Sequence, residues 1–413
     1  MILFSLLLAN TVWIACLLAL TLAFYMLLKR VERCQIPESD LPFVSIIVPA
    51  RNEEAKIARC LESLLSQDYP GFEVIVIDDR SSDRTPEIIE SFAKRDRRLK
   101  FVRGKDAPQG WVGKCNALAY AVGFASGDWF IFTDADTCHS AYSVRDAIAH
   151  AVRNKVDLIS FVPMQELGSF WEKLVMSVLL SSFLIGDPFH TVNDPKARRA
   201  YAYGQYIICR RRSYLALGGH QAVRDEIVED HALGRVFKEK GYKIAVADGK
   251  TLYSVRMYTN LESMWQGWTK NLYSLIDSRL SNLIMIVLCL LVSAFLPLIN
   301  LGIVVGLWLS QPDYFTPLLT VVVVAQWAFL AVWFWLTGEH RQGAGWPYFF
   351  LIPAGAIAVT ALHLHAAYLV LSGSQVSWKG RRYTVNTSKT IQPKTTVPLE
   401  QTIEPSLAPD PTE

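Results

Sequence analysis

Two aspartates, one residue apart, follow a short and strongly apolar segment near the middle of the chain. Residues 129–133 (WFIFT) are all aromatic or β-branched, which predicts a buried strand, and Asp134 and Asp136 come directly after it. Ligands of open α/β sheets bind at the carboxyl ends of strands. Because Mg²⁺ takes one or two carboxylates and completes its shell with water and substrate phosphates, the pair fits a divalent-cation site. A turn or a helix cap explains the pair alone equally well.

Two further polar segments follow predicted strands and should face the same crevice. Residues 49–53 (PARNE) come after the first strand, and Asp78 and Asp79 end the second. A carboxylate at this place can accept hydrogen bonds from a nucleobase or a ribose hydroxyl. The other interpretation is a turn in which Ser82 or Asp83 caps the next helix, and the two interpretations are compatible.

Two more segments stand directly before predicted helices. Residues 110–114 (GWVGK) combine a flexible backbone with a lysine at a helix start, which is a natural place for a phosphate. Glu229, Asp230 and His231 precede a second helical pattern. Acidic residues are common at helix N-termini for electrostatic reasons alone, and the functional interpretation is a general base.

Alternating strand and helix patterns between residues 36 and 250 would position these segments. Strands are predicted at 43–49, 73–79, 99–102, 129–133 and 156–161, and helices at 53–66, 85–95, 114–125 and 143–154. This alternation predicts an α/β fold, with a mainly parallel sheet and helices on both faces.

Long apolar runs flank this region. Residues 1–28 exceed the roughly 20 residues that span a bilayer and are followed by Lys29, Arg30 and Arg33, which predicts a retained anchor rather than a cleaved signal peptide. The basic residues should stay in the cytoplasm, together with the domain that follows. Further apolar runs occupy 283–309, 315–337 and 347–371, and His363 and His365 in the last are expected to face protein or an interface.

The number of membrane crossings conflicts with the charge distribution. One anchor plus three spans would place residues 378–382 (WKGRR) on the side opposite the soluble domain, whereas basic residues favour the cytoplasm. Pro297 and Pro353 lie inside two of the runs, so one run can be re-entrant or a short hairpin. From residue 373 the chain turns polar, and its Pro- and Thr-rich end is predicted to be disordered.

A predicted amphipathic helix precedes the second apolar run. Its apolar stripe includes Trp265 and Trp268, which predicts a helix lying in the membrane interface, with an ordinary core-packed helix as the alternative.

The 413 residues are 51% hydrophobic and 19% charged, and the net charge of +3 is too small to indicate nucleic-acid binding. Seven scattered cysteines without a CxxC pair argue against a disulfide framework or a zinc site and favour a reducing compartment.

Four ordered motifs resemble family 2 glycosyltransferases, which are inverting enzymes with a GT-A nucleotide-sugar fold. They are residues 48–54 (VPARNEE), 76–83 (VIDDRSSD), 133–136 (TDAD) and 228–230 (VED), and the resemblance covers about residues 43–275. Residues 110–116 (GWVGKCN) and the flanking spans are most similar to membrane-bound bacterial members that act on lipid acceptors. Those include hopanoid- and carotenoid-associated enzymes and, more distantly, ceramide glucosyltransferase.

The resemblance implies roles for individual residues. Asp230 would be the catalytic base, beside Glu229, and Asp134 and Asp136 would bind Mg²⁺ or Mn²⁺. The donor, expected to be a UDP-sugar, would be bound by Pro49, Arg51, Glu53, Asp78, Asp79, Lys114 and Asp134. Gln266, Trp268 and Lys270 would lie on the acceptor or diphosphate side. Processive members carry Gln-x-x-Arg-Trp, which residues 266–271 (QGWTKN) lack, so transfer of a single sugar is expected.

The expected protein is thus an integral enzyme of the bacterial inner membrane that glycosylates a lipid hydroxyl from the cytoplasmic side. The expected units are an anchor (1–35), a cytoplasmic GT-A domain (36–254), an interfacial helix (255–282), C-terminal spans (283–372) and a polar tail (373–413). Alternatives are a processive polysaccharide synthase and a non-catalytic membrane scaffold or transporter that kept the fold.

Overall fold

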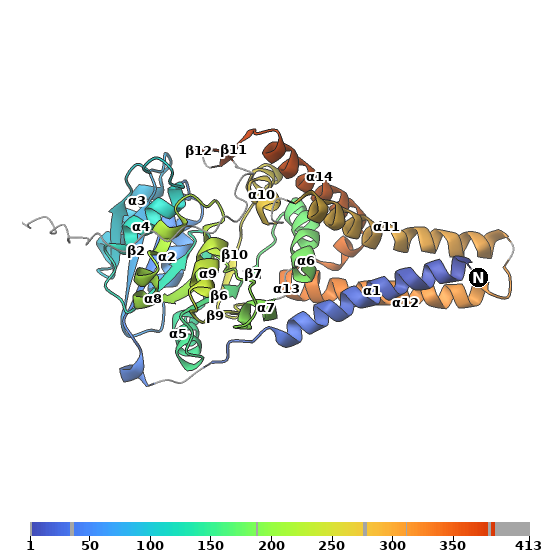
Figure 1. Cartoon of the computed structure of the whole chain (residues 1–413), viewed down its shortest axis with the longest axis horizontal. Helices are drawn as coiled ribbons and strands as arrows, with labels where there is room; N and C mark the ends of the chain where they lie inside the picture. Colours follow the sequence, from blue (N-terminus) through green and yellow to red (C-terminus); the bar gives the residue numbers. More distant parts are fainter. Residues whose placement is uncertain are drawn as a thin grey trace, which may run out of the picture.

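A seven-stranded sheet forms the centre of the α/β part of the chain. The computed structural model describes residues 2–33, 37–186, 189–275, 279–310, 312–378 and 381–384. The strand order is β3-β2-β1-β4-β8-β6-β9, and only β8 runs antiparallel to its neighbours (Figure 1). Every residue of β2 and β4 is buried, as expected for a sheet covered on both faces. The strands are β1 (Val44–Ala50), β2 (Phe72–Asp78), β3 (Leu99–Arg103), β4 (Trp129–Thr133), β6 (Leu158–Val162), β8 (Tyr206–Arg210) and β9 (Ile244–Asp248).

Helices cover both faces of this sheet, which confirms the predicted α/β class. On one face α2 (Ile57–Leu65), α3 (Thr85–Arg95) and α5 (Ser143–Arg153) bury their apolar sides. The other face is covered by α4 (Gly113–Val122), α8 (Arg211–Ala216), α9 (Glu229–Glu239) and the end of α1. A smaller sheet of β5 (Thr137–His139), β10 (Tyr253–Val255) and β7 (Met164–Gln165) lies beside it.

Some predicted boundaries were wrong, for local reasons. The helix predicted from residue 53 begins at Ile57, because the backbone N–H of Glu53 bonds to Thr85 Oγ1 (2.8 Å) and fixes a loop there. The helix predicted to reach residue 125 ends at Val122. At the start of α3 the N-cap position is Arg84 rather than Ser82 or Asp83, although the Asp83 carboxylate accepts the Thr85 N–H at 3.0 Å.

Four helices are long and apolar enough to cross a membrane, within the part of the chain that the structure describes. They are α1 (Ile2–Leu27), α11 (Leu280–Ser310), α12 (Thr316–Phe334) with its continuation η4 (Trp335–Glu339), and α14 (Ile352–Leu371). In Figure 1, α1, α11 and α12 extend together away from the sheet. Buried amides join these three, since Asn300 Nδ2 donates to Asn10 Oδ1 (3.0 Å) and to Gln326 Oε1 (3.2 Å).

The last apolar run packs into the helix bundle and leads back towards the α/β part. Before it, α13 (His340–Gln342) lies at the α/β part, where Lys250 Nζ donates to the His340 carbonyl at 2.8 Å. η5 (Trp346–Phe349) and the first turns of α14 then pack against the middle of α1 and α11, at Ile14 and Ala294. The later turns of α14 lead back to β11 (Gln375–Trp378), beside α10 (Figure 1). The segment that includes α14 therefore begins and ends near the α/β part.

The polar end of the chain is described only in part. β11 pairs with β12 (Arg381–Thr384) in a hairpin at the start of the predicted polar tail. Residues 385–413 of the predicted tail lie outside the described residues.

Helix α10 (Leu261–Leu275) lies between the sheet and the apolar helices, but protein rather than lipid covers its apolar stripe. Met264, Trp268 and Leu272 are buried in one cluster with α14 and with η2 (Glu172–Met176) and α6 (Ser177–Gly186). Trp265 Nε1 donates to His365 Nδ1 at 2.8 Å. The contacts therefore support the alternative of a core-packed helix over one immersed in the interface.

Replacing Trp268 with Ser should destabilise the packing of α10 against the apolar helices. Trp268 is 6% exposed and its Nε1 lies 3.0 Å from Met176 Sδ, so the change leaves a large cavity and should cost about 3–5 kcal/mol. Trp265→Ser should act in the same direction through His365. Thermal unfolding in one detergent measures both, with Trp308→Ser, which is 48% exposed on α11, as the control. Equal midpoints for all three variants would contradict the packing argument.

Candidate active site

A cavity of about 1120 Å³, here called the central cavity, runs from the carboxyl ends of the strands to the apolar helices. Eleven of the thirteen site residues predicted from the sequence line it; Asp78 and Gln266 do not. Those at the sheet end are Pro49, Arg51, Glu53, Asp79, Lys114, Asp134, Asp136, Glu229 and Asp230, and Trp268 and Lys270 follow on α10. Residues far apart in the sequence therefore meet because strands end, and α4 and α9 begin, at one edge of the sheet.

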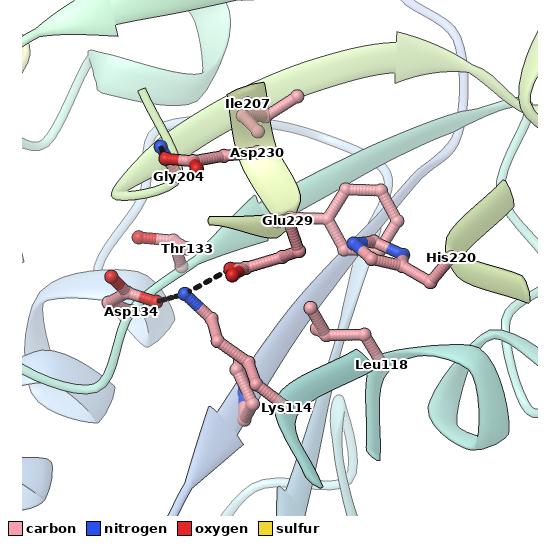
Figure 2. Close-up of a pocket in the computed structure, with 11 residues that line it drawn as sticks. Lys114, Leu118, Thr133, Asp134, Gly204, Ile207, His220, Glu229 and Asp230 are labelled. Atoms are coloured by element: carbon pink, nitrogen blue, oxygen red, sulfur yellow. Dashed lines mark hydrogen bonds and ion pairs between the residues drawn. The ribbon is translucent and has the colours of Figure 1, made fainter. Parts of the chain in front are cut away.

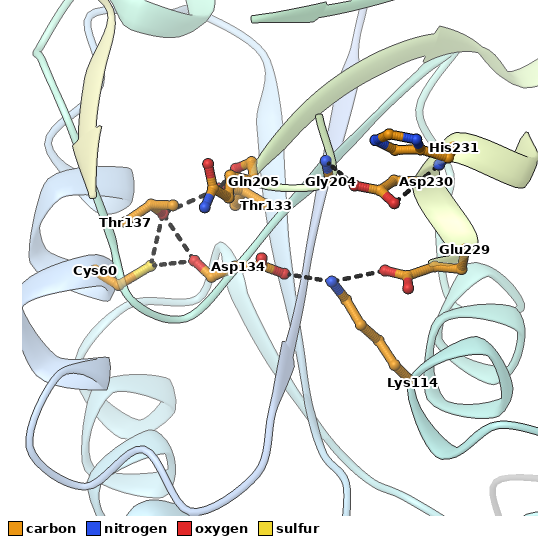
Figure 3. Close-up of polar contacts among 10 residues, drawn as sticks. All are labelled: Cys60, Lys114, Thr133, Asp134, Thr137, Gly204, Gln205, Glu229, Asp230 and His231. Atoms are coloured by element: carbon orange, nitrogen blue, oxygen red, sulfur yellow. Dashed lines mark hydrogen bonds and ion pairs between the residues drawn. The ribbon is translucent and has the colours of Figure 1, made fainter. Parts of the chain in front are cut away.

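Lys114 joins two of the predicted segments at the sheet end. Its Nζ lies 2.8 Å from Asp134 Oδ1 and 2.7 Å from Glu229 Oε1, as Figures 2 and 3 show. Burial alone would lower the pKa of Lys114, but the two carboxylates raise it well above its usual range. The ammonium group therefore remains charged at the bottom of the cavity.

Glu229 and Asp230 are adjacent in sequence but have different environments. The carboxylate of Glu229 pairs with Lys114, which lowers its pKa although burial opposes this. Asp230 Oδ2 accepts the N–H of Gly204 (2.7 Å) and Oδ1 accepts the N–H of His231 (2.8 Å), as drawn in Figure 3. Burial raises the pKa of Asp230, and Glu229 adds to the rise while His231 and Lys114 oppose it. One carboxyl is thus kept ionised and the other is made more basic.

A glycine is required beside Asp230. A Cβ at Gly204 would lie 2.8 Å from Asp230 Oδ2, too close for any larger residue without a shift of the carboxylate. The N–H of Gly204 reaches the carboxylate because no side chain stands between them.

The loop that carries Asp134 and Asp136 is held by buried polar contacts. Thr137 Oγ1 donates to the Asp134 carbonyl at 2.7 Å, and Cys60 Sγ lies 3.6 Å from the same oxygen (Figure 3). Lys56 Nζ stands 3.6 Å from Asp136 Oδ2. Sequence reasoning missed Lys56 and Thr137, because neither belongs to a motif; only Thr137's position next to the aspartates was a signal.

The two aspartates at the end of β2 differ in position. Asp79 lines the central cavity, whereas the buried carboxylate of Asp78 accepts the N–H of Ser81 at 3.2 Å and closes the turn. Arg51 Nη1 donates to the carbonyls of Asp79 (2.5 Å) and Arg80 (3.0 Å), which ties the first strand's loop to the second. Of the pair, Asp79 is therefore the one that lines the cavity.

The predicted residues of α10 also separate. Trp268 and Lys270 face the central cavity, but Gln266 is exposed on another side of the helix, where its Nε2 donates to Glu262 Oε1 at 3.3 Å. Gln266 is therefore separated from the residues that line the cavity.

The carboxylates of Asp134 and Asp136 fit a cation that brings most of its own ligands. Each carboxylate stands beside a lysine ammonium group, which a bound cation would have to displace or share the carboxylate with. Among the described residues no cluster of three or more His, Cys, Asp or Glu side chains suits a metal ion. Two carboxylates suit a hard divalent cation that completes its shell with diphosphate and water oxygens.

Comparison with known proteins finds similarity between part of this chain and enzymes named as sugar transferases. Residues 45–215 match the profile of the family described as Glycosyl transferase family 2. A 4,4'-diaponeurosporenoate glycosyltransferase of Staphylococcus aureus is 29% identical over 252 residues, which cover 58% of this chain and 64% of the relative. This chain thus spans less than two thirds of that relative's length.

Two solved structures resemble the chain at lower identity. A mannosyltransferase from Pyrobaculum calidifontis, in complex with GDP-Man and Mn²⁺, is 18% identical with a TM-score of 0.47 and covers 88% of this chain and 99% of its own. A glucosyl-3-phosphoglycerate synthase from Mycobacterium tuberculosis, with Mn²⁺ and UDP-glucose, is 19% identical with a TM-score of 0.41, covering 60% and 86%.

Proposed function

We propose that residues 45–215, which match the family described as Glycosyl transferase family 2, form a sugar-transferring domain of the GT-A type and catalyse a specific reaction. The chain moves one sugar from a nucleoside diphosphate, with a UDP-sugar as the expected donor, to a hydroxyl group of a membrane lipid. One observation carries the proposal: the central cavity contains Lys114, Asp134 and Asp230 and continues without interruption to residues of α11 and α14. A water-soluble donor and a lipid can therefore meet in it.

Asp230 supplies the base in this mechanism. The acceptor oxygen attacks the anomeric carbon on the face opposite the diphosphate, a carbon–oxygen bond forms, and the bond to the diphosphate oxygen breaks with inversion. Asp230 takes the hydroxyl proton, and its raised pKa suits it to do so near neutral pH. The N–H groups of Gly204 and His231 fix the orientation of the carboxylate.

Lys114 and the loop aspartates act on the leaving group. The Lys114 ammonium, held in place by Glu229, lies where negative charge grows on the departing diphosphate. Asp134 and Asp136 would hold Mg²⁺ or Mn²⁺, which neutralises part of that charge when bound. Asp79 is the proposed contact to the nucleoside, and Arg51 keeps its backbone in position.

The pH dependence of the reaction should reveal the base. Because the pKa of Asp230 is raised, its carboxylate becomes protonated, and can no longer act as a base, at a higher pH than an ordinary aspartate would. The value of kcat/KM should fall about tenfold per pH unit below that pKa, and the residual rate of Asp230→Asn should not show this limb. A wild-type profile that is flat down to the range of an ordinary aspartate would contradict the assignment.

Product analysis tests the proposal against its alternatives. Protein in lipid nanodiscs is incubated with a nucleotide sugar, and the masses of the extracted lipids are measured by mass spectrometry. We expect lipid that carries one added sugar. A ladder of products would favour a processive synthase, and intact donor under all conditions would favour a non-catalytic scaffold.

We further propose that the α/β part faces the cytoplasm of a bacterial plasma membrane, because Lys29, Arg30 and Arg33 follow α1 directly.

A further inference from the structure

Three arginines line the central cavity on the side of the proposed base. Arg198 and Arg199 lie in the loop after α7 (Phe189–Asn193), and Arg235 lies in α9, five residues after Asp230. They are here called the arginine patch. All three are exposed, so a ligand in the cavity can reach their side chains. At 1.5 Å per helical residue, Arg235 is roughly 7.5 Å along the axis from Asp230, so one head group can reach both.

Hydrogen bonds fix the backbone that carries two of these arginines. Lys238 Nζ donates to four carbonyl oxygens of this segment, at 2.7–3.1 Å, namely those of Thr191, Val192, Asp194 and Arg199. Asn193 exchanges two side-chain hydrogen bonds with the backbone of Val246 in β9, at 2.7 and 3.0 Å. Because Lys238 lies one turn after Arg235, these contacts hold the loop beside that turn of α9. The arginine patch is therefore a built feature of the cavity wall.

The loop begins where the first apolar helix ends. Val192 of α7 is buried in one cluster with Phe24 and Leu28 at the end of α1, and Figure 1 shows α7 beside that end. Helix α1 is long and apolar enough to span a bilayer. The loop with Arg198 and Arg199 therefore lies near the level at which lipid head groups would surround the end of α1.

Acidic side chains leave this positive charge largely uncompensated. Neither Arg198 nor Arg235 forms an ion pair within the part of the chain that the structure describes. Glu239, one turn after Arg235, lines the same cavity but pairs with no described basic group. Guanidinium groups held close together repel one another, and their planar N–H groups match the oxygens of a phosphate or carboxylate. A bound anion would therefore be stabilised here.

We infer that the arginine patch binds the anionic head group, a phosphate or a carboxylate, of a lipid that enters the central cavity from the membrane. Apolar side chains of α6 and α11 that line the same cavity, such as Phe183 and Met285, suit its hydrocarbon chain. The inference rests on the proposed function and deepens it. The acceptor lipid would carry a negative charge in addition to the hydroxyl that is glycosylated.

Binding of two matched probes tests this without requiring turnover. Native mass spectrometry of the full chain in dodecyl maltoside, an uncharged detergent, would compare hexadecyl phosphate with 1-hexadecanol, which share one alkyl chain. We expect the phosphate to bind about 5–30-fold more tightly, as charge-assisted hydrogen bonds at a solvent-exposed site would give. Arg198→Gln and Arg235→Gln should each reduce this preference by about 3–10-fold, and Arg235→Lys, which keeps the charge, should retain part of it.

Arg97→Gln is the matched control. Arg97 is exposed in the turn before β3 and does not line the cavity, so the same loss of charge there should leave the preference unchanged. Equal binding of both probes, or a preference that survives in both Arg198→Gln and Arg235→Gln, would overturn the inference. Complete displacement of hexadecyl phosphate by an equal concentration of inorganic phosphate would also overturn it, because the arginine patch would then be a site for free anions.

Donor binding and turnover, measured on the same preparations, separate the two proposals. Arg198→Gln and Arg235→Gln should bind UDP-glucose as the wild type does, and a parallel loss of donor affinity would assign the arginines to the donor diphosphate instead. Turnover without a preference for the phosphate probe refutes the lipid site alone. A preference without any donor turnover refutes the transferase assignment and leaves a site for anionic lipids.

Discussion

Replacing Asp230 with Asn is expected to lower kcat by roughly 10²–10⁴-fold while donor affinity stays nearly unchanged, because a general base contributes about that factor. Asparagine has the same size and can still accept the N–H groups of Gly204 and His231, so the local structure should persist. It cannot take the acceptor's proton. Steady-state rates with saturating donor and lipid, together with donor binding by calorimetry, measure the two quantities separately.

Asp225→Asn is the matched control for this variant. Asp225 is exposed in the loop before α9 and does not line the central cavity, so the same change of charge there should leave the rate within about twofold. If Asp230→Asn retains more than a tenth of wild-type activity, another group takes the proton and the assignment fails. A parallel loss of donor binding would instead indicate a distorted site.

Replacing Asp136 with Ala should remove metal-dependent turnover almost completely. Asp136 and Asp134 are the two carboxylates of the strand-end loop that line the cavity, so the change removes one of the two proposed protein ligands. We expect kcat/KM for the donor to fall by at least about 10²-fold and the metal concentration for half-maximal activity to rise. Titration of Mn²⁺ and Mg²⁺ against initial rate measures both effects.

Asp128→Asn tests whether the effect of Asp136→Ala belongs to this end of the strand. Asp128 is exposed and precedes β4 at its amino end, opposite the cavity. Its replacement should not change the metal requirement. Equal metal dependence in wild type and Asp136→Ala would remove Asp136 from the proposed metal site.

The sequence predicted the α/β part well because its signals are local. Buried strands such as 129–133 can be predicted directly from their apolar and β-branched residues. The polar residues that follow such strands then have to meet at one edge of the sheet. Lys56 and Thr137 escaped notice, because their contacts with Asp136 and the Asp134 carbonyl depend on tertiary packing. No spacing rule distinguishes Asp79, which lines the cavity, from Asp78, which closes a turn.

The membrane part was less predictable because composition does not record what covers an apolar surface. The stripe with Trp268 suits a bilayer interface as well as a protein core, and only the position of α14 decides for the core. The run at 347–371 has the length and composition of a span, yet its first turns pack at mid-bundle against Ile14. Pro353 lies in the first turn of α14 and marks where that helix begins, whereas Pro297 lies inside α11, which continues past it.

Donor turnover by the purified full chain in lipid nanodiscs tests the central claim most directly. Release of nucleoside diphosphate would be followed with UDP-glucose, UDP-galactose, UDP-N-acetylglucosamine and GDP-mannose, each with Mg²⁺, Mn²⁺ or EDTA. The account predicts that one donor, expected to be a UDP-sugar, is turned over with a divalent cation and not with EDTA. Failure to bind or turn over any donor, in protein that remains folded, would contradict it.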